Sequence, residues 1–267
     1  MNGDNKKGVS DAVDVIGFNN DFPDEYHREN PKRPVNGSET VSAVSTRGIY
    51  VTDPLRNTVS AYDTEEGMEE DYETAEKWWN FYGTREWEAG GGAWAGFDYR
   101  GEPSPYGWPS INSQYRIVDT CGFQKDSFLY YQAWWRADPV LHLFPHWNFE
   151  GREGDEIPVW IYSNVDKVEL IVNGKSRGTK DVPRRGYVEW KVRYEPGFIE
   201  ARGSKDGNVV ATEKHETTGP AISIRLTPDR YEIDADGEDV AILKAAIAGQ
   251  CRLQMAGSGS TSPEPEN

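Results

Sequence analysis

Short alternating runs, interrupted by turn signals about every ten residues, occupy the chain from Glu156 to Thr217. In the run Glu156–Asn164 the apolar side chains Ile157, Val159 and Ile161 fall on every second position. This is the period of a strand that buries one face. Several such strands in succession are typical of a β-sandwich, so the second half of the chain is predicted to be all-β.

The same pattern predicts four more strands in this region, at residues 167–172, 187–194, 198–205 and 208–217. Asn173-Gly174 follows the first of them, and this dipeptide readily adopts the positive φ angles of a tight hairpin turn. In the second, the alternation groups Trp190 with Val188 and Val192. We therefore expect Trp190 in the core of the sandwich.

The end of the chain changes character again at Gly219-Pro220, which looks like a domain boundary. Residues 222–227 and 240–248 predict two strands of another β module. Two strands bury no core of their own, so this module is expected to be only the start of a domain. Residues 250–267 are rich in Ser, Gly, Pro and Glu and are predicted to be disordered.

The first 145 residues mix strand and helix signals. Short strands are predicted at residues 14–18 and 34–39 and in the Gly-rich segment 90–99; helices are predicted at 63–82 and 126–136. Alternating strands and helices indicate an α/β fold. Three strand–helix pairs would form only part of a (β/α)8 barrel, because they do not close it.

Composition narrows the functional classes. The chain has 29 basic and 45 acidic residues and a net charge of −16, which argues against a nucleic-acid partner. No apolar run approaches the roughly 20 residues that cross a bilayer, so no membrane span is predicted. Aromatic residues make up 12% of a chain that is only 36% hydrophobic. Such rings suit stacking on a ligand, or else they are core residues.

Glu39 is the first candidate site residue. It ends a predicted strand among the small residues Gly37, Ser38 and Thr40. In a barrel, catalytic side chains project from the carboxyl ends of strands, and small neighbours leave room for a ligand. The alternative is an ordinary surface acid.

A second candidate group follows the Gly-rich segment. Trp94, Asp98, Glu102 and Trp108 lie on one stretch rich in Gly and Pro. Aromatic rings can stack on the C–H face of a sugar, and carboxylates accept hydrogen bonds from its hydroxyl groups. The alternative is a proline-ordered loop packed by its own rings.

No metal site and no cofactor are predicted. His142 and His146 have the spacing of two metal ligands on a helix, but Pro145 between them argues against a helix and no third ligand is near in the sequence.

Six motifs resemble bacterial β-galactosidases of glycoside hydrolase family 2. Residues 90–108 (GGGAWAGFDYRGEPSPYGW) and 118–123 (VDTCGF) resemble the end of the catalytic barrel, and 145–151 (PHWNFEG) and 168–178 (VELIVNGKSRG) the sandwich after it. Residues 14–19 (DVIGFN) and 37–48 (GSETVSAVSTRG) resemble the two preceding barrel strands. The resemblance covers roughly residues 12–248.

The resemblance implies a fold of class α/β plus all-β. Residues 1–145 would be the last three strand–helix units of a TIM barrel, and 146–219 an immunoglobulin-like β-sandwich. Residues 220–249 would begin a further β domain, and 250–267 would be a disordered tail. The chain would then be a C-terminal fragment of such an enzyme.

The resemblance also implies a retaining glycosidase. Glu39 matches the family's nucleophile, Trp94 its aromatic platform, and Asp98 and Glu102 its sugar-contacting loop. Retention requires a second carboxyl group as acid/base, which in this family is the Glu of an Asn-Glu pair on an earlier barrel strand. The chain contains no Asn-Glu dipeptide, and Asn20 stands where the family usually has an aromatic residue.

The expected function is hydrolysis of terminal β-galactosides or related β-glycosides by the parent enzyme, with little activity of this chain alone. A carbohydrate substrate and the preceding part of the same enzyme are the implied partners. The alternatives are a non-catalytic carbohydrate-binding or structural fragment, and a hydrolase that uses another acid such as Glu102. A periplasmic or extracellular location fits the parent enzyme, although residues 1–10 are polar and predict no secretory signal.

Overall fold

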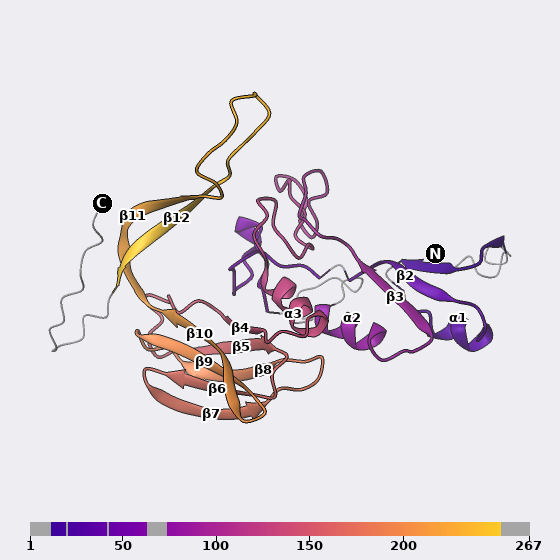
Figure 1. Cartoon of the computed structure of the whole chain (residues 1–267), viewed down its shortest axis with the longest axis horizontal. Helices are drawn as coiled ribbons and strands as arrows, with labels where there is room; N and C mark the ends of the chain where they lie inside the picture. Colours follow the sequence, from indigo (N-terminus) through magenta and orange to yellow (C-terminus); the bar gives the residue numbers. More distant parts are fainter. Residues whose placement is uncertain (1–11, 20, 42, 63–73, 252–267) are drawn as a thin grey trace.

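The computed structural model describes residues 12–19, 21–41, 43–62 and 74–251. A small parallel sheet with helices is followed along the chain by antiparallel sheets (Figure 1). The mixed organisation expected from the sequence is therefore confirmed. The predictions for Asn20, for residues 63–73 and for the tail beyond residue 251 lie outside the described residues.

The parallel sheet has the order β1-β2-β3. Its strands alternate with helices, and the elements in chain order are β1 (Ile16–Asn19), α1 (Asp24–Glu29), β2 (Val35–Thr40), a 3-10 turn (Pro54–Arg56), α2 (Ala75–Tyr82), β3 (Glu88–Ala93) and α3 (Asp126–Trp135). All three predicted strands are found. Because the strands are parallel, their carboxyl ends lie at one edge of the sheet. Glu39, at the end of β2, and Trp94, directly after β3, lie next to each other at this edge.

Helix α2 packs directly against the sheet. Thr74 caps its first turn by accepting a hydrogen bond from the backbone N–H of Lys77 at 3.1 Å. Tyr82, in its last turn, is buried against Gly37 of β2 and Gly91 of β3, where a Cβ atom would clash with the tyrosine ring. These glycines allow the close approach of helix and sheet.

Two antiparallel sheets form the central part of the chain. One has the order β4-β5-β8, from β4 (Leu141–Phe144), β5 (Glu156–Ser163) and β8 (Val188–Arg193). The other has the order β10-β9-β6-β7, from β6 (Lys167–Val172), β7 (Lys175–Asp181), β9 (Phe198–Lys205) and β10 (Asn208–Glu216). We call them together the two-sheet unit. The five strands predicted by alternation are all present, and Asn173 and Gly174 turn the chain with φ of 48° and 77°.

One hydrophobic cluster joins the inner faces of the two sheets. Val159 of β5 and Trp190 of β8 meet Leu170 of β6 and Ile199 of β9 in this cluster, and all four are buried. The predicted core position of Trp190 is confirmed. Strand β4 pairs with β5, so this unit begins at Leu141 rather than at residue 146. The four residues of β4 are too short a run for the alternation to be visible in the sequence.

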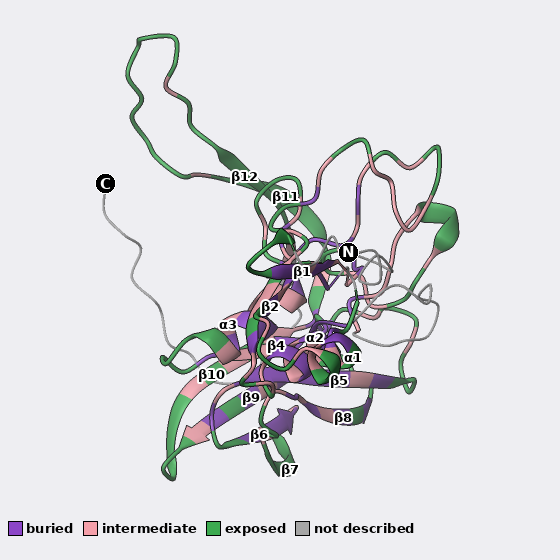
Figure 2. Cartoon of the chain, turned by 90° about the vertical axis from the view of Figure 1, so that its right-hand side faces the viewer, coloured by how far each residue is buried: buried purple, intermediate pink, exposed green. Residues whose placement is uncertain are grey.

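The last two strands form a hairpin outside the two-sheet unit. β11 (Thr218–Pro228) and β12 (Leu243–Cys251) pair only with each other and project away from the other sheets (Figure 1). Their apolar side chains, including Ile224 and Ile247, are exposed. Figure 2 shows β11 and β12 largely in the green of exposed residues. Gly219-Pro220 lies inside β11, at a shift of the strand register where a proline needs no ladder partner.

Within the described part of the chain, no helix combines the length and the apolar character that a membrane crossing requires.

Trp190→Ala should lower the free energy of unfolding by about 3–5 kcal/mol, the usual cost of emptying a buried aromatic site. Trp190 is 7% exposed, and its indole N–H donates to the carbonyl of Arg177 at 3.3 Å. Urea unfolding measures the loss. Trp108→Ala is the matched control, because Trp108 is 86% exposed and the same atoms are removed. Equal losses in both variants would contradict the core assignment.

Candidate functional site

The carboxyl ends of β2 and β3 bring two of the predicted site residues to one place. Thr40 pairs with Ala93, and the next residue, Trp94, donates its backbone N–H to the carbonyl of Thr40 at 2.8 Å. The Thr40 hydroxyl donates to the carbonyl of Gly92 at 3.0 Å and accepts from the indole of Trp78 at 2.6 Å. Glu39, which precedes Thr40, therefore lies beside the start of the Trp94 loop.

Glu39 is half-buried and is held by the neighbouring strand. The side-chain amide of Asn19, the last residue of β1, donates to its Oε2 at 3.1 Å. A hydrogen bond from the adjacent strand end orients the carboxylate. The Glu39 carboxylate therefore has a defined orientation and keeps access to solvent.

Trp94 rests on a buried arginine. Its side chain is 37% exposed, and the guanidinium carbon of Arg116 lies 4.9 Å from the ring centroid. Arg116 itself is 0% exposed and also lies against the rings of Tyr99, at 4.6 Å, and Tyr115, at 4.4 Å. These distances are within the range of cation–π contacts.

Glu102 lies at the exposed rim of this group. Its carboxylate accepts hydrogen bonds from the hydroxyl of Tyr115 at 2.7 Å and from the hydroxyl of Tyr99, and it lies 3.8 Å from a terminal nitrogen of Arg116. We call these five residues, Trp94, Tyr99, Glu102, Tyr115 and Arg116, the Arg116 cluster. Burial lowers the pKa of Arg116, while the charges of Glu102, Asp98 and Glu39 are among those that oppose this shift.

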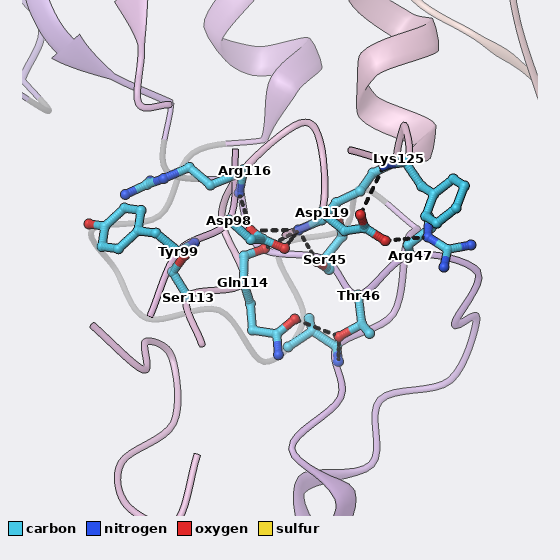
Figure 3. Close-up of polar contacts among 12 residues, drawn as sticks. Ser45, Thr46, Arg47, Asp98, Tyr99, Ser113, Gln114, Arg116, Asp119 and Lys125 are labelled. Carbon is cyan, nitrogen blue, oxygen red and sulfur yellow. Dashed lines mark hydrogen bonds and ion pairs between the residues drawn. The ribbon is translucent and has the colours of Figure 1, made fainter. Parts of the chain in front are cut away.

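Asp98, the third of the predicted site residues, lies in a buried ion pair. It is 9% exposed and forms an ion pair of 2.8 Å with Lys125, which is 1% exposed (Figure 3). The Lys125 ammonium also donates to the carbonyls of Ser45, at 2.7 Å, and Gln114, at 3.0 Å. Burial raises the pKa of Asp98, and Lys125 opposes this rise. In this arrangement the Asp98 carboxylate ties three segments of the loop region together.

Trp108 lies on an exposed turn. Backbone bonds from Gly101 to Ile111 and from Gln114 to Ser104, each 3.0 Å, close the base of this loop. The ring of Trp108 is 86% exposed. Its indole is therefore open to a ligand but lies on the outer part of the loop.

The structure thus groups Glu39 and Trp94 at the sheet edge, joins Glu102 to Trp94 through Arg116, and pairs the buried Asp98 with Lys125. Sequence reasoning missed Asn19 and Arg116. Asn19 could have been found as the polar end of the first strand, since parallel strand ends meet. Arg116 has no such signal, because a buried arginine and an exposed one look alike in a sequence.

Comparisons with known proteins found relatives that match most of the chain. A family model described as a domain of unknown function (DUF4982) matches residues 154–211. The chain is 36% identical to "Beta-galactosidase BoGH2A" of Bacteroides ovatus, over 97% of the chain and 31% of that protein. The structure of a β-glycosidase from Bacteroides vulgatus superimposes with a TM-score of 0.81 at 28% identity, over 92% of this chain and 36% of that one.

A further solved structure, a β-glucuronidase from glycoside hydrolase family 2, gives a TM-score of 0.67 at 26% identity over 89% of this chain and 25% of that chain. The chain corresponds to the C-terminal portion of a family 2 glycosidase. It spans about a third of the length of the first relatives it matches.

Proposed function

We propose that this family 2 segment carries the nucleophile and the sugar platform of a retaining glycosidase that acts on terminal β-galactosides or related β-glycosides. The observation that carries the proposal is the position of Glu39 and Trp94 at one edge of the parallel sheet. A carboxylate beside a partly exposed indole can attack the anomeric carbon of a sugar that stacks on the ring. The similarity of the chain to the β-galactosidase of Bacteroides ovatus supports a galactoside as the substrate.

The proposed architecture is that of the expected domains. Residues 1–145 would be the last three strand–helix units of a TIM barrel, and the parallel order β1-β2-β3 supports this. Residues 146–219, together with strand β4, would be an immunoglobulin-like sandwich, which the shared core of the two-sheet unit supports. Residues 220–249 would begin another β domain, and the exposed apolar hairpin is consistent with such a beginning.

In the proposed reaction, the Glu39 carboxylate forms a bond to the anomeric carbon as the bond to the leaving oxygen breaks. A carboxylic acid about 5–5.5 Å from the nucleophile would protonate that oxygen and later activate water. The Glu of an Asn-Glu pair is the expected acid, and this sequence has no such pair. We therefore place the acid on a preceding part of the parent enzyme and expect little hydrolysis by this chain alone.

A second candidate function is carbohydrate binding without catalysis. The lack of an Asn-Glu pair favours it, since a platform and a carboxylate suffice for binding but not for protonation of a leaving group. In this case Trp94 and Glu102 would bind sugar with the same geometry, and Glu39 would form no covalent bond.

Assays with the chain separate the two candidates. We expect slow release of nitrophenolate from 4-nitrophenyl β-galactoside, negligible hydrolysis of lactose, and binding of the non-hydrolysable isopropyl β-thiogalactoside by calorimetry. Trp94→Ala should weaken that binding about tenfold, or about 1.4 kcal/mol. Binding without any release would favour the second candidate. Absence of both binding and release would contradict the proposal.

A further inference from the structure

Arg116 carries a buried charge without hydrogen bonds. Its three guanidinium nitrogens are buried and have no hydrogen-bond partner among the described residues, and the side chain is 0% exposed. Removing a charged group from water costs several kcal/mol unless other groups compensate it. The compensation comes from the faces of three aromatic rings and from the Glu102 carboxylate at 3.8 Å.

We propose that Arg116 is a positioning residue of the sugar site, whose guanidinium holds the Trp94 indole and the Glu102 carboxylate in the orientation in which they contact sugar. This inference rests on the proposed function. Two of the four groups that Arg116 contacts have a markedly open side: Trp94 is 37% exposed and the Glu102 side chain 46%. Arg116 supports both from the buried side.

The base of the Arg116 side chain is fixed by the buried ion pair. Its backbone N–H donates to Asp98 Oδ1 at 3.2 Å, and Lys125 donates to the same oxygen at 3.0 Å. Figure 3 shows the guanidinium extending away from this pair on the side of Tyr99. The Asp98–Lys125 pair therefore fixes the backbone of Arg116, and the aromatic rings fix the position of its guanidinium.

A planar guanidinium suits this position better than an ammonium. Arginine stacks on ring faces, whereas lysine presents a compact charge that prefers hydration. The Tyr99 and Tyr115 hydroxyl groups, whose rings face Arg116, donate to Glu102. Loss of the guanidinium would remove the surface on which the Trp94 indole rests, and it would remove the charge and the ring contacts that fix the two tyrosines which hold Glu102.

The test compares Arg116→Met, which removes the charge and the plane, with Arg85→Met as the matched control. Arg85 also lies over a ring, with its guanidinium carbon 3.5 Å from the Phe81 centroid, but it precedes β3 at the opposite end of the sheet. The first readout is the indole N–H resonance of Trp94 in the ¹⁵N-labelled full chain, assigned from its loss in Trp94→Phe. We expect it to shift in Arg116→Met and to stay unchanged in Arg85→Met.

The second readout is the dissociation constant of isopropyl β-thiogalactoside. Arg116→Met should raise it about tenfold, as Trp94→Ala does, and the double variant should show about tenfold rather than hundredfold weakening because the two losses are one interaction. If Arg116→Met does not fold, Arg116→Lys keeps the charge and loses the plane, and it should also shift the Trp94 resonance.

Two results would overturn the inference: an unshifted Trp94 resonance in a folded Arg116 variant, or additive losses in the double variant. A wild-type chain that binds no sugar would contradict the proposed function instead. In that case the Trp94 resonance still decides whether Arg116 holds the indole.

Discussion

Glu39→Gln should lower the turnover of an activated aryl β-galactoside by several powers of ten. The variant keeps the size of the side chain and its hydrogen-bonding partner Asn19, but an amide cannot form the glycosyl-enzyme bond. Release of nitrophenolate measures the loss. Glu25→Gln is the matched control. Glu25 is an exposed acid on α1, so this substitution makes the same chemical change at a position outside the sheet edge.

A trapping experiment tests the nucleophile assignment of Glu39 without relying on the slow release of nitrophenolate. With 2-deoxy-2-fluoro-β-galactosyl fluoride, the Glu39 carboxylate would bond to the anomeric carbon and fluoride would leave without needing a proton. We expect one added fluorosugar mass on the peptide that contains Glu39, and none in Glu39→Gln.

A comparison of two substrates tests whether the chain lacks the acid that protonates the leaving group. A nitrophenolate leaves unaided, whereas the glucose of lactose requires protonation. We therefore expect lactose to be a very poor substrate of this chain. Lactose hydrolysis at ordinary glycosidase rates that survives Glu39→Gln would contradict both the nucleophile and the need for an acid outside the chain.

The fold was most predictable where local patterns determine it. In β5, β6 and β8 every second side chain enters one shared core, so alternation alone located the strands and Trp190. Helix α1 has six residues and β4 has four, and neither is long enough to display a period. Their positions depend on pairing and packing with distant segments.

The site was predictable only in part for the same reason. Glu39 could be proposed because strand ends and small neighbours are visible in the sequence, and Trp94 because of its Gly-rich surroundings. The burial of Arg116 depends on Tyr99 and on Trp94, which reach it from another segment of the loop. Likewise, the pairing of Asp98 with Lys125 joins residues 27 positions apart, and no local pattern marks it.

A second charged cluster lies where α3 meets the two-sheet unit. His142 of β4 contacts Asp126 of α3 through Nε2 at 2.7 Å and Glu213 of β10 through Nδ1 at 3.8 Å. Glu213 also contacts His215 at 3.1 Å and accepts the backbone N–H of Leu143 at 2.8 Å. The hydroxyl of Tyr50 lies 3.5 Å from Asp126, and a further imidazole, His146, follows β4. The cluster thus links a helix of the first half to both antiparallel sheets.

The charges in this cluster make stability depend on pH. Burial alone would lower the pKa of His142, but the hydrogen bonds and charges of Asp126 and Glu213 raise it to about 9. Burial would raise the pKa of Glu213, but the two imidazoles lower it to about 2. The raised histidine pKa stabilises the fold fully below about pH 6.5, and this stabilisation is lost as the pH rises towards 9. The lowered pKa of Glu213 stabilises the fold fully above about pH 4.5, and this stabilisation is lost as the pH falls towards 2.

Between about pH 6 and pH 9.5, the free energy of unfolding of the chain should fall by about 3 kcal/mol more than that of His142→Gln, since one pKa unit corresponds to about 1.4 kcal/mol. Urea unfolding at the two pH values measures this difference, and an NMR titration should place the His142 midpoint near 9. Taking the difference between the two proteins removes the contributions of groups that both share, such as Glu76 and Glu88, whose pKa values burial raises to about 7. An equal fall in stability for the chain and for His142→Gln would show that the imidazole of His142 does not hold α3 to the two-sheet unit through its charge.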